Sequence, residues 1–501
     1  MIGSPARAAT VHFPTLLRSN QMARARLRHM IIVLPGITGS ILQKDDHDLW
    51  AFSGSALWNS LAHRRQMLDD LRIHGVDDYT LDDLGDGVKA VGLAQDASII
   101  PGLVKIVTGY NDLVAAIRAR FDIIGHGFQS AEPSNLFEFP YDWRRDNRAS
   151  ARRLQHLVED RVRLWREYTG DRSAKVILIA HSMGGLVSRY YLEALEGWRD
   201  CLALISLGTP YRGSLNALRF VIEGYKEATL DLTDCLRSYT SVYQLLPTYE
   251  VVNDEGKYRG VAEISADPLD RSRAESALAF HRSIAEKVNE HRSDPAYLRD
   301  GYKVVPFVGT RQPTLQSAIL AGGKVTFSSA LPPDVYELLE AGDGTVPRFS
   351  ANPPELDNEF RQTFVPQKHG SLQASTIILA DLISRLEQMQ VPRTRAIRGP
   401  EVSAEGSAIA LAIDDLYTAA DPPQLNASIL NLGGDSWSVV GSLTLADATQ
   451  PGQPLEFRRN GEEWTCRVPG LATGLYRVEV RTTLDYPLGP PPVTDLFEVA
   501  P

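Results

Sequence analysis

The hydrophobic positions of the chain follow two patterns, and the change between them comes near residue 391. Before that point, short runs rich in apolar residues alternate with stretches in which apolar residues recur at helical spacing. The apolar-rich runs lie at residues 30–34, 136–139, 176–180, 202–207 and 303–308, and the helical stretches at 111–121, 148–168 and 372–389. An unbroken apolar run, such as those at 30–34 and 176–180, is typical of a strand that is buried on both faces of a sheet. Strands that alternate with helices predict an α/β domain with a parallel sheet.

Two segments depart from this alternation. Residues 211–300 carry scattered apolar and aromatic residues, which predict an inserted helical cap. Residues 391–400 contain prolines and polar side chains and predict a linker. Beyond the linker, turn residues separate short alternating runs, as in a β-sandwich of the immunoglobulin-like kind. The predicted parts are an N-terminal extension at 1–28, an α/β domain at 29–390 with the cap at about 211–300, a linker at 391–400 and an all-β sandwich at 401–501.

Composition and charge limit the classes of partner. The chain has 501 residues, of which 43% are hydrophobic and 23% charged, and its formal net charge is −10. This composition is that of a soluble globular protein. The negative charge argues against nucleic acid and against an anionic membrane as a general electrostatic partner. We therefore expect no nucleic-acid binding and at most peripheral contact with a membrane.

The cysteines and the apolar runs bear on the compartment. Cys201, Cys235 and Cys466 are few and lack the C-x-x-C spacing, so neither a disulfide framework nor a zinc site is indicated. One bridge between Cys201 and Cys235 stays open. The basic stretch at 24–29 resembles the start of a signal peptide, but Pro35 ends the apolar run that follows it. No apolar run reaches the roughly 18 residues of a membrane span. A cytoplasmic location is the default expectation.

One turn carries the clearest chemical signal. Residues 176–186 read V-I-L-I-A-H-S-M-G-G-L, so Ser182 follows a buried strand and precedes a helix. This is the arrangement of a nucleophile elbow, whose usual pattern is G-x-S-x-G and whose small residues permit a strained turn. Ala180 stands at the first glycine position and keeps that side chain small. The positive end of the helix dipole favours the negative charge that develops in acyl transfer. The pattern predicts an α/β-hydrolase fold with Ser182 as its nucleophile.

A serine nucleophile needs a base and an acid that orients this base, and in α/β-hydrolases they follow in the order Ser, Asp/Glu, His. Asp343 in the turn A-G-D-G-T-V-P and His369 in the loop Q-K-H-G-S-L fit that order. A plain turn aspartate and an exposed loop histidine are the alternatives. His281, in the cap segment A-F-H-R-S, is the main rival base, and Asp142 is a rival acid if the order is broken. We interpret His181, next to the nucleophile, as a packing residue.

The oxyanion site and the substrate site are less marked in the sequence. The backbone N–H of Met183, directly after the nucleophile, is the expected first donor to the oxyanion. The second donor is expected from the glycine-rich loop after the first strand, with Thr38 preferred and Ile37 next. The apolar content of the cap exceeds what a solvated loop needs, and predicts a movable cap that sets substrate choice. The candidate substrate contacts in the cap are Phe220, Tyr243 and Leu246.

Five motifs, in the same order, resemble one family. P-G-I-T-G-S, P-Y-D-W-R, H-S-M-G-G-L-V-S-R-Y-Y, L-G-T-P-Y-R-G-S and G-D-G-T-V-P lie over about residues 30–390. They are similar to motifs of the lecithin:cholesterol acyltransferase family, which includes lysosomal phospholipase A2 and phospholipid:diacylglycerol acyltransferases. The resemblance implies acyl transfer from a lipid ester through an acyl-serine, to an alcohol or to water. It also implies that Ser182, Asp343 and His369 form the triad. The close cysteine pair of secreted members has no counterpart here, and the sandwich lies outside the resemblance.

These residues and this resemblance predict a serine-dependent ester hydrolase or acyltransferase that acts on a lipid, preferably a glycerophospholipid, and needs neither a metal nor an organic cofactor. Two alternatives stay open. The same mechanism could serve a soluble ester, or the chain could be an interaction protein whose hydrolase domain is secondary to the sandwich. The polar linker predicts that a catalytic part ending near residue 395 folds and works without the sandwich, which would recruit a protein partner or a surface.

Overall fold

The computed structural model describes most of the chain, in several segments. These are residues 24–50, 61–94, 109–125, 127, 132–227, 230–333, 335, 341–357, 362–391, 407–418, 422–430, 432–433, 436–446, 452–461, 463–484 and 489–500. The predicted linker, apart from residue 391, and most of the predicted N-terminal extension lie outside the described residues.

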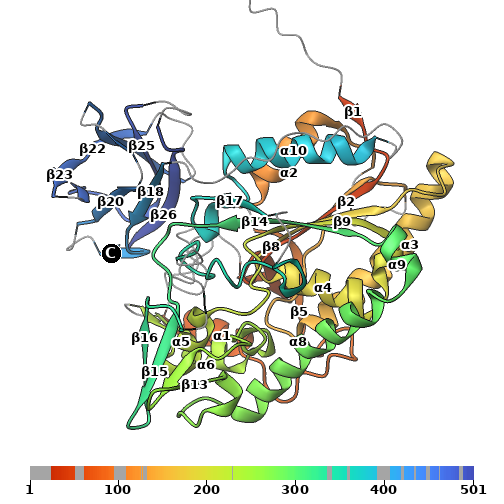
Figure 1. Cartoon of the computed structure of the whole chain (residues 1–501), viewed down its shortest axis with the longest axis horizontal. Helices are drawn as coiled ribbons and strands as arrows, with labels where there is room; N and C mark the ends of the chain where they lie inside the picture. The colour runs from red at the N-terminus through yellow and green to blue at the C-terminus, as the bar shows by residue number, and fades with distance from the viewer. Residues whose placement is uncertain are drawn as a thin grey trace, which may run out of the picture.

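A six-stranded sheet forms the centre of the larger part of the molecule (Figure 1). All five pairings between its strands are parallel. In spatial order the strands are β17 (Thr363–Val365), β14 (Lys303–Gly309), β9 (Cys201–Leu207), β8 (Val176–His181), β2 (Met30–Leu34) and β7 (Leu136–Glu138). Every residue of β2 and β8 is buried, as the unbroken apolar runs require. The prediction of an α/β domain with a parallel sheet is confirmed.

Helices cover both faces of this sheet (Figure 1). One face carries α2 (Asn111–Arg120) and α10 (Thr376–Gln390), and the other carries α3 (Asn147–Thr169) and α4 (Gly184–Ala194). The sequence explains the bounds of α3. The side chain of Asp146 accepts a hydrogen bond from the N–H of Arg148 and so caps the first turn. Gly170, with φ of 70°, ends the helix in the left-handed conformation.

The cap segment is not purely helical, and the prediction of a helical cap is wrong in this respect. Its helices are α5 (Leu215–Glu223), α6 (Thr233–Ser238), α7 (Thr240–Tyr243), α8 (Arg271–His291) and α9 (Pro295–Asp300). Between them, β12 (Val252–Asp254) and β13 (Lys257–Arg259) form a hairpin. This hairpin joins β15 (Ser317–Ala321) and β16 (Lys324–Ser328) in a four-stranded sheet. The sequence reading missed this sheet because half of its strands come from beyond residue 300, and because three-residue strands show no alternation.

Short elements complete the larger part. They are β1 (Ala25–Arg26), β3 (Ser40–Lys44), β4 (His47–Trp50), α1 (Leu61–Leu71), β5 (Val88–Leu93), β6 (Phe121–Asp122), β10 (Lys226–Glu227) and β11 (Leu230–Asp231). Strands β3, β4 and β5 form a three-stranded antiparallel sheet directly after the loop that follows β2.

The C-terminal part consists of two sheets around a hydrophobic cluster of its own. One sheet contains β18 (Ala408–Ala412), β20 (Gln424–Leu430), β24 (Glu463–Arg467) and β23 (Arg458–Asn460). The other contains β19 (Leu416–Thr418), β26 (Val493–Ala500), β25 (Gly474–Thr482), β21 (Val439–Leu445) and β22 (Gln453–Glu456). Both sheets contribute to the cluster, for example with Leu425 from β20 and Val478 from β25. The prediction of short strands after the linker is confirmed.

Cysteines and helix lengths add two findings. Cys201, Cys235 and Cys466 are all free and buried, so the open question of a bridge between Cys201 and Cys235 is answered in the negative. Among the helices that the structure describes, none combines the length and the apolar character needed to cross a membrane.

Candidate active site

Ser182 lies on the turn between β8 and α4, at the end of a central strand of the main sheet. Its φ is 51°, in the left-handed region that residues other than glycine seldom adopt. The turn is held by the sheet itself, because the N–H of Ser182 donates to the carbonyl of Leu207 at 2.8 Å. The carbonyl of Ser182 accepts from the N–H of Gly185 at 3.0 Å. The strained turn that the sequence predicts is therefore present and supported on both sides.

Close packing explains the two glycines after Met183. A Cβ atom on Gly184 would lie 2.4 Å from the carbonyl oxygen of Pro35, and one on Gly185 would lie 1.9 Å from Oγ1 of Thr209. Pro35 belongs to the loop after β2, and Thr209 to the loop after β9. The start of α4 thus fits between the loops that follow both neighbouring strands, which only glycine allows.

The structure brings Ser182, His369 and Asp343 together. Nε2 of His369 lies 2.8 Å from Oγ of Ser182, and Nδ1 of His369 lies 2.7 Å from Oδ2 of Asp343. Exposure is 4% for Ser182, 1% for His369 and 0% for Asp343, so both hydrogen bonds are shielded from bulk water. A buried aspartate that accepts from Nδ1–H leaves Nε2 free to accept the serine proton. The order and the geometry are those that nucleophilic catalysis by serine needs.

The carboxylate of Asp343 is fixed by backbone groups around it. Its Oδ1 accepts from the N–H of Thr345 at 3.0 Å and from the N–H of Val346 at 2.7 Å. The carbonyl of Asp343 in turn accepts from the N–H of His369 at 2.8 Å, which ties the two loops to each other. The nearest preceding strand of the main sheet is β14, and the β15–β16 hairpin is inserted between β14 and Asp343. The sequence reading did not identify this insertion.

His181 does more than pack. Its Nε2 donates to the carbonyl of His369 at 3.0 Å, and its Nδ1 accepts from the hydroxyl of Tyr110 at 2.9 Å. The oxygen of Tyr110 also accepts from the N–H of Gly36 at 2.8 Å. Burial, with His369 beside it, lowers the pKa of His181 to about 3 and keeps the ring neutral. A neutral His181 therefore links the backbone of the base to the loop after β2.

The loop predicted to supply the second oxyanion donor lies against the nucleophile. A Cβ atom on Gly36 would be only 2.8 Å from Cβ of Ser182, so the loop backbone passes directly over the serine. Thr38 has a φ of 63°, and its carbonyl accepts from the indole N–H of Trp50 at 3.2 Å. Thr38, Ile37 and Met183 are all buried, at 1% exposure or less. Their roles as donors to the oxyanion stay predictions.

The rival catalytic residues have other partners. His281 lies on α8, and its Nε2 donates to the carbonyl of Gln244 at 2.7 Å. Asp142 accepts twice from the side chain of Arg144, at 2.9 and 2.7 Å. Arg144 is itself 0% exposed and also contacts Asp86 at 2.8 Å. The charge of Arg144 is thus buried among carboxylates and carbonyls.

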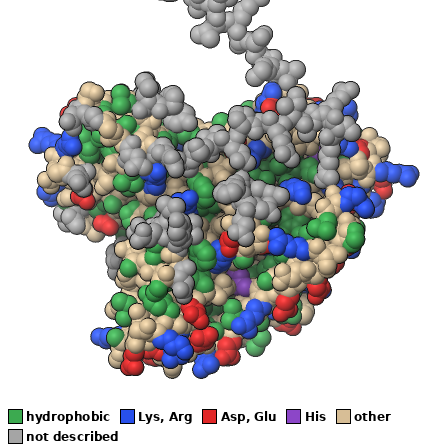
Figure 2. Space-filling model, viewed as in Figure 1, with side chains coloured by type: hydrophobic (Ala, Val, Ile, Leu, Met, Phe, Trp, Pro, Cys, Tyr) green, Lys and Arg blue, Asp and Glu red, His purple; other side chains and the backbone are tan. Residues whose placement is uncertain are grey.

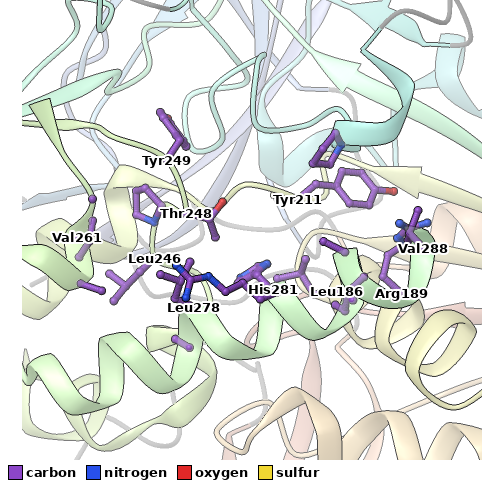
Figure 3. Close-up of a pocket in the computed structure, with 18 of the residues that line it drawn as sticks. Leu186, Arg189, Tyr211, Leu246, Thr248, Tyr249, Val261, Leu278, His281 and Val288 are labelled. Atoms are coloured by element: carbon purple, nitrogen blue, oxygen red, sulfur yellow. The ribbon is translucent and has the colours of Figure 1, made fainter. Parts of the chain in front are cut away.

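The predicted substrate contacts in the cap separate into two groups. Phe220 is 2% exposed and packs against Tyr225, with ring centroids 6.1 Å apart. Tyr243 is 2% exposed, and the guanidinium of Arg273 lies 4.1 Å from the centre of its ring. Both belong to the hydrophobic core. Leu246, in contrast, lines the wall of a cavity (Figure 3).

This cavity has a volume of about 650 Å³ and lies between α4, α8 and the segment after α7 (Figure 3). Leu186 and Arg189 border it from α4, and Leu278 and His281 from α8. Ser182 is not among its lining residues, but Leu186 is one helical turn beyond the nucleophile.

On the face shown in Figure 2, positive and negative side chains are interspersed. Within the described part of the chain, no cluster of His, Cys, Asp or Glu has the arrangement of a metal site.

The fold and the geometry of Ser182, His369 and Asp343 define the class, which is an α/β-hydrolase. Residues 125–283 match the family model described as lecithin:cholesterol acyltransferase. The resemblance predicted from the five motifs is therefore confirmed over this segment, which is similar to that family. The matched segment contains Ser182 but neither Asp343 nor His369.

Relatives with curated names agree with the family match. Human "lysosomal phospholipase A and acyltransferase" is 29% identical over 136 residues, which are 25% of this chain and 31% of the human protein. "Lecithin-cholesterol acyltransferase-like 4" of Arabidopsis thaliana is 23% identical over 339 residues, which are 58% of each chain. The chain thus spans about a third of the length of the human relative.

Among solved structures, a Bacillus licheniformis lipase, BlEst2, is similar over 94% of this chain and 93% of its own, at 13% identity and a TM-score of 0.34.

Proposed function

We propose that the protein is a serine-dependent hydrolase or acyltransferase of lipid esters that works through an acyl-serine intermediate. The observation that carries this proposal is the pair of hydrogen bonds from Ser182 to His369 and from His369 to Asp343, at 2.8 and 2.7 Å. A serine in the left-handed region carries backbone strain, and such strain is typical of functional sites. Here the strained serine is buried and contacts a histidine that a carboxylate orients, which is the arrangement of a catalytic triad.

The contacts suggest the order of proton transfers. His369 takes the proton of Ser182 at Nε2 while the serine oxygen attacks the acyl carbonyl. Asp343, which accepts from Nδ1–H, stabilises the imidazolium that forms. The N–H groups of Met183 and Thr38 are the proposed donors to the oxyanion. The imidazolium then protonates the departing alcohol, and His369 next deprotonates the water or alcohol that releases the acyl group from the serine.

The substrate class that we propose is a glycerophospholipid. The names of the human and plant relatives refer to a phospholipase and to acyltransferases, and the motifs of this chain resemble those of the same family. The cavity beside α4 offers an apolar wall for an acyl chain, from Leu186, Leu246 and Leu278. Its volume of about 650 Å³ is within the range of small-molecule sites.

Labelling tests the chemistry. The full chain should react with a fluorophosphonate probe, and peptide mapping should place the adduct on Ser182. The Ser182→Ala variant should keep the melting temperature of the unsubstituted protein and lose the label. A chain that unfolds normally but takes no label, or takes it equally in the variant, would remove the proposal.

Chain-length dependence tests the substrate class. Leu278→Trp places bulk in the cavity without touching Ser182, so hydrolysis of long-chain esters should fall roughly four- to fifteenfold more than hydrolysis of acetate esters, which corresponds to the free energy of one or two buried methylene groups. Leu298→Trp, at an exposed position on α9, is the matched control and should change neither. Equal losses for both esters would favour a soluble ester as substrate, which is the alternative that the sequence leaves open.

The C-terminal sheets share one hydrophobic cluster, and we interpret them as a β-sandwich module.

A further inference from the structure

The C-terminal sheets contact the larger part of the molecule at the loops that carry His369 and Asp343. In Figure 1, β26 and β18 lie on the side of the C-terminal part that faces β17 and the turn containing His369. Strand β26 packs against that turn. The sequence reading treated the C-terminal domain as separable, but the contacts place it directly behind two of the three residues of the candidate site.

The loop of His369 has three anchors in and next to β26. The ammonium of Lys368 forms an ion pair with the carboxylate of Asp495, and each side chain is 3% exposed. The side-chain amide of Gln367 donates to the carbonyl of Pro492 at 2.8 Å. The hydroxyl of Ser371 donates to the carbonyl of Thr494 at 3.0 Å. Residues on both sides of His369 are thus fixed to one strand of the C-terminal domain.

The loop of Asp343 has an anchor in β18. Gln312 is 0% exposed, and its side chain makes hydrogen bonds in both directions with that strand. Its amide donates to the carbonyl of Ile409 at 3.1 Å, and its oxygen accepts from the N–H of Leu411 at 3.3 Å. The backbone N–H of Gln312 donates to the carbonyl of Gly342 at 3.0 Å, next to Asp343.

We propose that the C-terminal domain is a positioning part of the active site, in which Asp495, through Lys368, holds the loop of His369 at its distance from Ser182. This inference rests on the proposed function and adds its dependence on a second domain. A buried ion pair has a well-defined geometry only while both partners are present, because an unpaired buried charge draws in water or moves to the surface. Nucleophile and base must be placed within about 0.5 Å, so a shift of this loop lowers the rate without a change in chemistry.

The test compares full-length variants. Asp495→Asn keeps the shape of the side chain and removes its charge. We expect kcat for a short soluble ester, counted per labelled Ser182, to fall about 10- to 100-fold with KM unchanged. Asp495→Glu should restore most of the rate. Glu479→Gln, at an exposed position on the neighbouring strand β25, is the matched control and should behave like the unsubstituted chain.

Two further measurements separate positioning from loss of fold. Hydrogen exchange should become faster at residues 366–373 in Asp495→Asn and stay unchanged in β8 and α4. Lys368→Met and Asp495→Leu should each lower kcat, and the double variant should be no slower than the slower single variant, because both remove the same contact.

The result that would contradict this positioning role differs from the result that would contradict the proposed function. An unsubstituted chain that takes no fluorophosphonate label contradicts the proposed function. An Asp495→Asn chain with unchanged kcat per labelled serine, or additive losses in the double variant, overturns the positioning role alone.

Discussion

The proposed nucleophile, Ser182, and its proposed base, His369, are held in place by two different means. Ser182 lies on a turn whose geometry is set by consecutive residues and by the central strands on either side of it. His369 and Asp343 lie on loops beyond the end of the sheet, and buried contacts from a second domain fix those loops. On the proposed mechanism, a catalytic loop therefore has anchors that are encoded more than a hundred residues away from it.

The two regions also differ in how their conformations are stabilised. The backbone strain at Ser182, whose φ is 51°, is offset by the burial of β8, in which every residue is buried. The loop of His369 has no such support from its own strand, because β17 is only three residues long and lies at the edge of the sheet. We therefore expect changes to the closely packed glycines of the turn to act mainly on stability and changes at the loops to act mainly on rate.

The largest expected effect is that of His369→Ala. Without the base, Ser182 keeps its place but cannot lose its proton, so kcat should fall by about 10⁴- to 10⁶-fold. The sheet should persist, because His369 lies on a loop that follows the edge strand β17. His281→Ala is the control, since its side chain bonds to the carbonyl of Gln244 instead. Steady-state turnover of a short ester measures both, and equal losses in the two variants would reopen the choice of base.

Sequence alone predicted the elements with strong local patterns. The apolar run before Ser182 and the small residues around it predict the turn. The close packing that requires small residues there involves only the turn itself and the loops after the two neighbouring strands. Helix α3 was predicted to within one residue at each end, since its buried positions recur at helical spacing and a glycine ends it. The order of serine, aspartate and histidine selected Asp343 and His369, and the structure places His369 next to Ser182 and Asp343 next to His369.

Sequence could not predict the contacts that depend on tertiary placement. Lys368 and Asp495 are 127 positions apart, and nothing in either local pattern marks a buried pair. The link from His181 through Tyr110 to Gly36 joins three segments, and each residue alone is typical of a core position. The strands that complete the sheet of the cap come from a hairpin beyond residue 300, so the boundary drawn from composition divided one unit.

The next largest effect is expected at the turn, for Gly185→Ala. The added Cβ would lie 1.9 Å from Oγ1 of Thr209, which is 1% exposed and has little room to move. We expect a loss of about 2–3 kcal/mol in the free energy of unfolding, measured by urea denaturation. Gly92→Ala, whose added Cβ has no neighbour nearer than 3.8 Å, is the matched control. Thr209→Gly should restore much of the lost stability. A Gly185→Ala protein with an unchanged free energy of unfolding would show that the turn is less closely packed than its contacts indicate.

A smaller effect is expected where the two regions meet, for Tyr110→Phe. The variant removes the hydroxyl that accepts a hydrogen bond from the N–H of Gly36 and donates one to His181. Leaving these two buried groups unsatisfied should cost about 1–3 kcal/mol of stability. It should also lower kcat by roughly tenfold, because the ring of His181, which donates to the carbonyl of His369, loses its hydrogen bond from Tyr110. Tyr476→Phe, in the C-terminal domain, loses a single hydrogen bond to Ala472 and should leave kcat unchanged. A Tyr110→Phe protein with full activity would show that the link through His181 only packs.

The smallest expected effect concerns pH and the support behind the turn. His291, on α8, lies between the carboxylates of Glu193 and Glu196, 2.7 and 2.9 Å away. Burial alone would lower the pKa of His291, but the hydrogen bonds to Glu196 and Glu193 outweigh burial and raise it above 6.5. A raised pKa in the folded state means that the contact stabilises the fold fully below about pH 6.5, and that this contribution is lost as the pH rises through the folded pKa. His181 has the opposite sign, because a pKa lowered to about 3 makes the fold less stable as the pH falls below 6.5.

His291→Gln separates these two contributions. The variant should lower the melting temperature more at pH 6 than at pH 9, by a few degrees at most, while kcat at its optimum stays within twofold because α8 supports α4 and not the loop of His369. Melting curves across this range measure the effect, with His156→Gln, on the exposed face of α3, as the control. A uniform loss at every pH would mean that His291 acts by shape alone. A large fall in kcat would mean that the turn at Ser182 depends on distant contacts as much as the loops do, and the difference between the two regions would disappear.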